Sequence, residues 1–424
     1  MHGLGNTLQS VRSSGWSNVF LKRICWMSEP ITSTAWPRRH SSVQVVVAGH
    51  LCLDLTPDLL DKKLPTGGGL SMSGSLAISP GGAVPNVGLA LIRLGELVRL
   101  VGRTGDDAVA ALLRSALSIA VEQPSLCPVQ GRGKSYSIVI AQSGMDRFFI
   151  HCPGANETFT SDAVRDEDLA NGRWLHFGYP PLMPAMCEND GKELELLFTR
   201  ACERGLRTSL DFCSIDPSAK DSLKWDRILS KCGPKVMVFA PGLEEISDAL
   251  DVPGSPEMWW SSISDISSHL LALGFTIVVL KLGNRGLYLR STDSAARAAA
   301  WDLGIEWTSR ELFISCFEAT MFNANGARDC TIAGLITALS QDFTPEETLT
   351  FAAAVGACSV EASDASTGVM GLDATIDRIE AGWMGRAAVL PSLAWQYDES
   401  EQLWRGPHEY RPYDLRFPEE IAHG

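Results

Sequence analysis

Short apolar stretches alternate along the chain with stretches in which apolar residues recur at helical spacing. The apolar runs predict buried strands at 44–49, 98–101, 173–177, 207–212, 235–240 and 276–281. The helical spacing predicts helices at 86–95, 107–119, 191–204, 244–250, 261–273, 329–340 and 346–361. Strands that alternate with helices favour an α/β fold with a mainly parallel sheet, whose sites lie beyond the carboxyl ends of the strands.

Two segments interrupt this alternation. Residues 133–151 read as a strand, a Ser143-Gly144 turn and a second strand, and residues 66–82 form a glycine-rich stretch. An ordinary surface hairpin and a small separate sheet both fit this pattern.

The segment at 323–339 places candidate chemistry at the start of a helix. Small residues at Gly326 and Ala327 lead to Asp329, and Ile332, Leu335, Ile336 and Leu339 then share one helical face. Free N–H groups and the helix dipole at such an end can hold an anion, which suits the transfer of a negatively charged group to a hydroxyl. The alternative is that Asp329 only caps its helix.

Composition narrows the function classes. The chain is 45% hydrophobic and 20% charged, which is typical of a globular protein with a large core. A net charge of −14 argues against a general nucleic-acid binder, because phosphate backbones need a basic surface. No apolar run approaches the roughly 18 residues of a membrane span, so no membrane association is expected.

The eleven cysteines include no Cys-x-x-Cys pair, which favours reduced thiols in a cytoplasmic protein. Residues 1–43 are rich in serine and basic residues with a single acid, Glu29, and we interpret them as a disordered extension or a mis-assigned start. Mitochondrial targeting is the alternative reading of that composition. Residues 386–424 contain several aromatic residues, and we therefore expect this segment to pack on the core.

Two motifs are excluded by their context. The GRGKS stretch at 131–135 lacks the first glycine of a P-loop, because position 128 is Pro128, and an alternating strand pattern follows it. The pair Gly3 and Gly5 has no preceding strand and no third glycine, so it is not a dinucleotide fingerprint. A nicotinamide dehydrogenase, which the α/β pattern alone would allow, is therefore disfavoured.

A second motif makes the segment at 323–339 more specific. Residues 81–95 pair Gly81 and Gly82 with Asn86 and continue as a helical pattern that ends at Gly95. Together the two segments resemble the signature motifs of the ribokinase (PfkB) family of carbohydrate kinases. In that family the second motif is Gly-Ala-Gly-Asp, whereas this chain has Arg328 in the third position.

Other segments resemble the same family in the same order. They are 46–56 with Asp54, 101–107, 209–212, 239–246 and the hairpin at 278–290. The resemblance extends from about residue 45 to about residue 385 and implies a ribokinase-like domain at 44–385, with lid segments at about 62–82 and 131–156. The family often uses this small β lid for dimerisation, so a homodimer through the lid is an open alternative to a monomer.

The resemblance also implies roles for individual residues on the substrate side. Asp329 would be the general base, and the backbone N–H groups of Gly326, Ala327, Arg328 and Asp329 would form the anion hole. The residues expected to bind the sugar are Asp54, Gly81, Gly82, Asn86 and Asn156. From the residues alone, a strand-end turn for Asp54, a helix cap for Asn86 and a turn for Asn156 remain alternatives.

On the nucleotide side, Lys281, Gly283 and Gly286 match the family's hairpin, and Glu245 matches the glutamate that orders magnesium. A solvated strand-end lysine and an acid in a first helical turn are the alternatives for Lys281 and Glu245. Gly242 stands where the family has Asn, so part of the magnesium shell is missing or replaced. Arg328 could strain the turn through its Cβ, point away from it, or bind phosphate through its guanidinium.

The resemblance implies an ATP- and Mg²⁺-dependent transfer of the γ-phosphate to a hydroxyl of a sugar or nucleoside. The alternative, raised by Arg328 and Gly242, is a catalytically weakened or inactive protein that binds sugar or nucleotide as a sensor.

Overall fold

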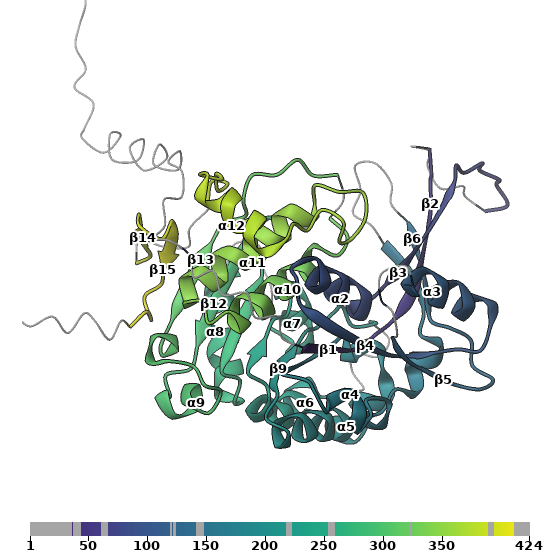
Figure 1. Cartoon of the computed structure of the whole chain (residues 1–424), viewed down its shortest axis with the longest axis horizontal. Coiled ribbons are helices and arrows are strands. Elements are labelled where there is room, and N and C mark those ends of the chain that lie inside the picture. Colours follow the sequence, from purple (N-terminus) through teal and green to yellow (C-terminus); the bar gives the residue numbers. More distant parts are fainter. Residues whose placement is uncertain are drawn as a thin grey trace, which may run out of the picture.

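The computed structural model describes residues 36, 44–60, 67–118, 121, 124–140, 148–217, 223–252, 259–322, 324–388 and 394–410. The extension expected at 1–43 lies outside the described residues except for Trp36, and so do the Ser143-Gly144 turn and residues 411–424. Within the described residues the strands form one sheet of eleven and a second sheet of four. Figure 1 shows the large sheet between two layers of helices, with the small sheet to one side.

The large sheet has the order β14-β15-β13-β12-β11-β10-β9-β8-β1-β4-β5. Neighbours from β11 to β5 are parallel, whereas neighbours from β11 to β14 are antiparallel. The strands are β1 (Gln44–Gly49), β4 (Leu97–Thr104), β5 (Ser125–Pro128), β8 (Trp174–Gly178), β9 (Arg207–Leu210), β10 (Val238–Phe239), β11 (Ile277–Lys281), β12 (Leu287–Ser291), β13 (Glu311–Ile314), β14 (Gln396–Asp398) and β15 (Leu403–Arg405).

Alternate residues along the strands point to opposite faces of the sheet and belong to two different hydrophobic cores. Val45 and Val47 of β1 belong to one, and Val46 and Ala48 to the other. The first core lies under α2 (Ala83–Arg93), α3 (Ala108–Ser118), α9 (Ala295–Ala299), α10 (Ala327–Ser340), α11 (Pro345–Ser359) and α12 (Leu372–Glu380). The second lies under α4 (Asp166–Leu169), α5 (Pro184–Glu203), α6 (Trp225–Cys232), α7 (Leu243–Ala249) and α8 (Trp259–Ala272). Short 3₁₀ turns include η1 (Gly154–Thr158), η2 (Ser161–Ala163), η3 (Pro180–Leu182), η5 (Gly233–Lys235), η6 (Gly283–Arg285) and η7 (Ile305–Trp307).

The α/β class is confirmed, and each expected strand and helix occurs with somewhat different bounds. One difference concerns α10, because Asp329 and every residue from there to Leu339 is buried, not only the face that carries Ile332 and Leu335. The helix packs between α2 and α11. Gly334 permits the close approach to α11, since a Cβ there would lie 2.9 Å from Cα of Ala352.

The apolar run at 46–56 forms two strands in two different sheets, not one. Gly49 ends β1 with a φ of 125°, and β2 (Cys52–Pro57) then joins the small sheet. That sheet has the order β3-β2-β6-β7, where β3 is Leu76–Gly81, β6 is Tyr136–Ile140 and β7 is Phe148–Cys152. We call this four-stranded sheet the lid. Asp54 therefore lies inside a strand of the lid, and the strand-end turn considered for it is wrong.

The lid exposes large apolar side chains on both of its edge strands. Ile78 of β3 is 46% exposed, and Phe149 and Ile150 of β7 are 52% and 56% exposed. Surfaces of this kind often mark contact sites in otherwise polar exteriors.

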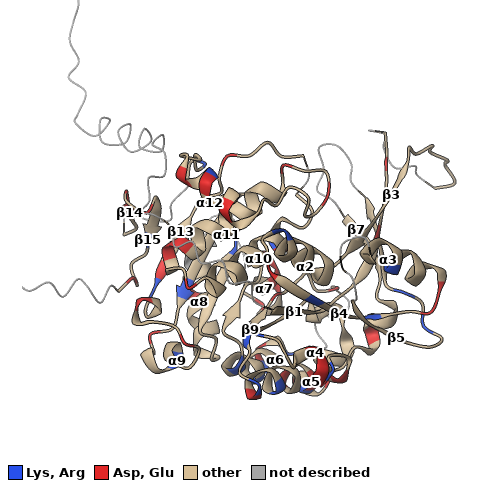
Figure 2. Ribbon diagram, in the orientation of Figure 1, with Lys and Arg blue, Asp and Glu red and all other residues tan. Residues whose placement is uncertain are grey.

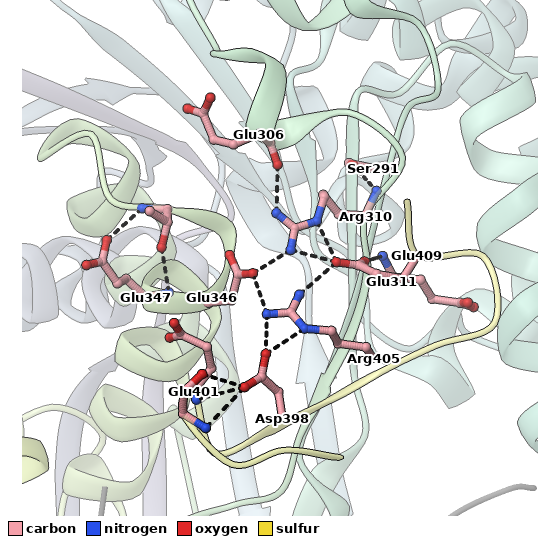
Figure 3. Close-up of polar contacts among 12 residues, drawn as sticks. Ser291, Glu306, Arg310, Glu311, Glu346, Glu347, Asp398, Glu401, Arg405 and Glu409 are labelled. Atoms are coloured by element: carbon pink, nitrogen blue, oxygen red, sulfur yellow. Dashed lines mark hydrogen bonds and ion pairs between the residues drawn. The ribbon is translucent and has the colours of Figure 1, made fainter. Parts of the chain in front are cut away.

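The C-terminal hairpin β14–β15 extends the large sheet beyond β13 and is held there by a buried ion network (Figure 3). Arg310, directly before β13, bonds Glu346 at the start of α11 and lies 2.6 Å from Glu409. Arg405 of β15 lies 2.8 Å from both glutamates. The network thus joins a strand, a helix and the chain's C-terminal segment.

Acidic and basic residues alternate along the ribbon, for example on α4, α5 and α6 at the bottom of Figure 2. Arg200 and Arg204 of this region both bond Asp166, and Lys235 lies 3.1 Å from Glu195. None of the helices in the described part of the chain is both long and apolar enough to cross a membrane.

Candidate active site

The residues expected to act on a substrate converge where the parallel strands end at their carboxyl side. Asp329 lies at the start of α10, and Asn86 lies in the first turns of the adjacent helix α2. In Figure 1 these two helices lie side by side over the sheet, next to the lid. The fold therefore brings together segments 243 residues apart in the sequence.

Asp329 does not cap its helix. The N-cap of α10 is Gly326, which adopts a left-handed φ of 74° and makes no side-chain cap bond. The Asp329 carboxylate instead accepts hydrogen bonds from Nδ2 of Asn86 at 2.9 Å and from the hydroxyl of Tyr179 at 2.7 Å. Asn86 is likewise not a cap, because Gly82 begins α2. Both side chains thus face the site.

The first turn of α10 presents the N–H groups of Ala327, Arg328 and Asp329, which have no acceptor within an α-helix. With the helix dipole, such groups favour an anion. Arg328 lies inside the helix and the positive φ of this turn is at Gly326, so the strain considered as one possibility for Arg328 is absent.

Burial raises the pKa of Asp329 to about 6. The positive charge of Lys281 opposes this rise, as do the hydrogen bonds from Asn86 and Tyr179. A carboxylate with such a pKa is ionised at neutral pH but retains basicity. It can accept a proton from a hydroxyl held against it.

Tyr179 was missed by sequence reasoning. It follows β8 with a left-handed φ of 66°, which is uncommon for a bulky residue and concentrates at functional sites. Burial and the negative charge of Asp329 raise the pKa of its phenol, which keeps it protonated as a hydrogen-bond donor.

A buried ion pair lies beneath the site. Lys281, the last residue of β11, lies 2.6 Å from Oδ1 of Asp211, which directly follows β9. Burial raises the pKa of Asp211, and Lys281 opposes that rise. The lysine expected at the nucleotide therefore has its ammonium group turned into the protein, where it also moderates the charge of Asp329.

The two glycines of the first motif lie against different residues, Gly81 against Asp54 and Gly82 against His50. A Cβ on Gly81 would lie 2.3 Å from Cγ of Asp54, so only glycine fits opposite this carboxylate. Gly82 has a φ of 91°, and a Cβ there would lie 2.4 Å from Nδ1 of His50. The motif thus positions the lid strand over the start of α2.

Further polar groups line the junction of lid and core. Asn156 in η1 is fully buried, and its Nδ2 donates to the carbonyl of Leu51 at 3.1 Å. Nε2 of His50 lies 3.4 Å from Nε2 of His151, and the latter ring contacts Ser137 at 3.0 Å. Burial lowers the pKa of both histidines, to about 4 for His151, so both rings are neutral. No sequence pattern marked these histidines, because they are distant in the sequence and meet only where the lid joins the core.

On the nucleotide side, η6 joins β11 to β12. Gly283 has a φ of 61° with open space where a Cβ would be, and Gly286 has a φ of 127°. A Cβ on Gly286 would lie 1.9 Å from the carbonyl oxygen of Ile314. The two glycines therefore fix the shape of this turn.

Glu245, expected at magnesium, accepts one hydrogen bond on each of its carboxylate oxygens. Oε1 bonds Nη1 of Arg328, and Oε2 accepts the backbone N–H of Gly242 at 2.8 Å. Arg328 also lies 3.5 Å from Glu244. These partners leave Glu245 a poor fit for a magnesium ion, because the guanidinium already supplies the positive charge there.

The chain is similar in sequence to a known family and in fold to solved structures. Residues 43–370 match the pfkB family of carbohydrate kinases. Fructokinase of Escherichia coli is 23% identical over 308 residues, which cover 70% of this chain and 85% of that protein. Fructokinase-2 of Oryza sativa subsp. japonica is 25% identical over 179 residues, 42% of this chain and 49% of that protein. The chain spans less than half the length of several such plant relatives.

Solved structures show the same fold. The ribokinase of Arabidopsis thaliana complexed with ribose and ATP has a TM-score of 0.62 at 19% identity and covers 80% of this chain and 99% of that one. A fructokinase with bound ATP from Xylella fastidiosa has a TM-score of 0.61 at 18% identity, with 80% and 98% covered.

Proposed function

Because this chain belongs to the pfkB family of carbohydrate kinases, we propose that it transfers the γ-phosphate of ATP to a hydroxyl of a sugar or sugar-like substrate. The observation that carries the proposal is the Asp329 carboxylate, fixed by Asn86 and Tyr179 beside the N–H groups of α10. A base and a set of anion-binding donors thus meet at one point, as phosphoryl transfer requires.

In the proposed reaction, Asp329 accepts the proton of the acceptor hydroxyl. The oxygen of that hydroxyl forms a bond to the γ-phosphorus while the bond from phosphorus to the leaving ADP oxygen breaks. The N–H groups at the start of α10 stabilise the moving phosphoryl group. Asp54, Asn86 and Asn156 hold the sugar under the lid, and Gly283 and Gly286 shape the nucleotide side. Magnesium, where it accompanies the nucleotide, neutralises phosphate charge.

The test is ADP release with Mg-ATP across a panel of hexoses, pentoses and nucleosides. Turnover on one class of acceptor supports the proposal and identifies that class. Absence of turnover on every acceptor, while ATP or a sugar still raises the melting temperature, would overturn it in favour of the binding protein that Arg328 and Gly242 suggested.

Turnover should depend on pH through Asp329. The base acts as a carboxylate, and its pKa is raised to about 6, so the rate should be full above this value and fall below it. We expect kcat/KM to fall about tenfold for each pH unit below about 6. The measurement is the initial rate at saturating ATP between about pH 5 and 8, with the melting temperature followed in parallel. A flat profile in folded protein would contradict this assignment.

We also propose that the lid mediates a homodimer, because Ile78, Phe149 and Ile150 are exposed on its edge strands. Phe149→Glu would place a charge in this contact and should shift the protein to a monomer in sedimentation velocity. An equivalent change at Leu196, which is 43% exposed on α5, is the matched control and should leave the assembly unchanged. A monomeric wild type would disprove the dimer.

A further inference from the structure

Two departures from the family's motifs, Gly242 and Arg328, meet in space although they are 86 residues apart. A Cβ on Gly242 would lie 2.6 Å from Oε2 of Glu245 and 3.2 Å from Nη1 of Arg328. A larger side chain at position 242 would therefore press on the glutamate that holds the guanidinium. Glycine makes room for this ion pair, so the two departures are coupled.

The guanidinium is held at the start of α10, beside the proposed base. Arg328 is in the first turn of α10, next to Asp329, and its side chain is 44% exposed. Its contacts with Glu245 and Glu244 use two of the five N–H donors of a guanidinium. The remaining donors are on a group that solvent, and hence a ligand, can reach.

We infer that Arg328 supplies from the protein the positive charge toward the nucleotide phosphates, in place of a magnesium ion ordered by Glu245. The inference rests on the nucleotide binding that the proposed function requires. Guanidinium groups bind phosphate through charge-assisted, often bidentate hydrogen bonds. Glu245 then acts as a positioning residue that orients the guanidinium, since its Oε2 is itself held by the N–H of Gly242.

The inference is tested by the binding of ADP, measured by calorimetry with magnesium and with EDTA. The wild type should bind ADP with similar affinity in both conditions. Arg328→Gln should weaken binding in EDTA by about tenfold or more, the usual effect of losing a charge-assisted hydrogen bond. Arg114→Gln, at an exposed arginine of α3, is the control for net charge and should bind as the wild type does.

A double-mutant cycle tests the coupling between the two positions. Gly242→Asn alone should lower the melting temperature, because it crowds Glu245, whereas the same change beside Arg328→Gly should cost much less. The double variant should bind ADP weakly in EDTA and recover with magnesium. Additive effects in the cycle would disprove the coupling, and wild-type binding that needs magnesium as much as the double variant does would disprove the role of Arg328.

These outcomes are independent of the acceptor panel, because ADP binding needs no sugar. If no acceptor is turned over but ADP binding depends on Arg328, the inference stands and the proposed function fails. If an acceptor is turned over and Arg328→Gln binds ADP in EDTA as the wild type does, the proposed function stands and the inference about Arg328 fails.

Discussion

Asp329→Asn should reduce turnover by about 10²–10⁴-fold, the usual contribution of a general base. The amide keeps the size of the carboxylate but cannot accept the proton of the substrate hydroxyl. Its oxygen can still accept from Asn86, and its NH₂ can donate to the Tyr179 oxygen, so the hydrogen-bonded pair should persist. The measurement is kcat on the acceptor that the wild type uses.

The melting temperature and the affinity for ADP are the controls, and both should stay close to those of the wild type. Tyr179→Phe provides a graded comparison. It removes one hydrogen bond that lowers the pKa of Asp329, so the acid limb of the pH profile should move to higher pH while most of kcat is retained. Turnover by Asp329→Asn within a few-fold of the wild type would exclude Asp329 as the base.

The parts of the site that lie in contiguous motifs could be predicted from the sequence. Gly326 and Asp329 stand three residues apart at a helix start, and Gly81, Gly82 and Asn86 form one short segment. Helical periodicity places these residues near helix starts, whereas their assignment to one site came from the resemblance to the PfkB motifs. The roles assigned to them remain proposals, but their positions around one point follow from the fold.

The remaining groups depend on contacts that no local pattern encodes. Lys281 looked like a nucleotide ligand, yet the order of strands β9, β10 and β11 places it against Asp211. His50 and His151 meet only because the apolar run at 46–56 divides between two sheets. The place of Arg328 depends on its partner Glu245 and on the space left by Gly242, which are more than 80 residues away in the sequence.

Arg310→Met should lower the free energy of unfolding by about 3–5 kcal/mol, the usual effect of removing one partner from a buried ion pair. The Arg310 side chain is 4% exposed, and its loss would remove one of the two guanidinium groups that bond both Glu346 and Glu409 (Figure 3). The measurement is urea unfolding at neutral pH. Because Arg405 still neutralises part of this charge, we expect a value near the lower end of the range.

Arg132→Met is the matched control, since Arg132 pairs with Glu157 on the surface, where the two side chains are 50% and 42% exposed. Such a pair contributes about 0–1 kcal/mol, so the control should unfold nearly as the wild type does.

The pH dependence of the free energy of unfolding separates the contribution of charge at Arg310 from that of packing. Burial raises the pKa of Glu346, but Arg310 and Arg405 outweigh burial and the net shift is downward. The stabilisation is therefore present above the ordinary glutamate pKa and is lost as the pH falls through the lowered value. The difference between Arg310→Met and the wild type should shrink in acid, and a loss independent of pH would show that Arg310 stabilises the C-terminal hairpin by packing instead of by charge.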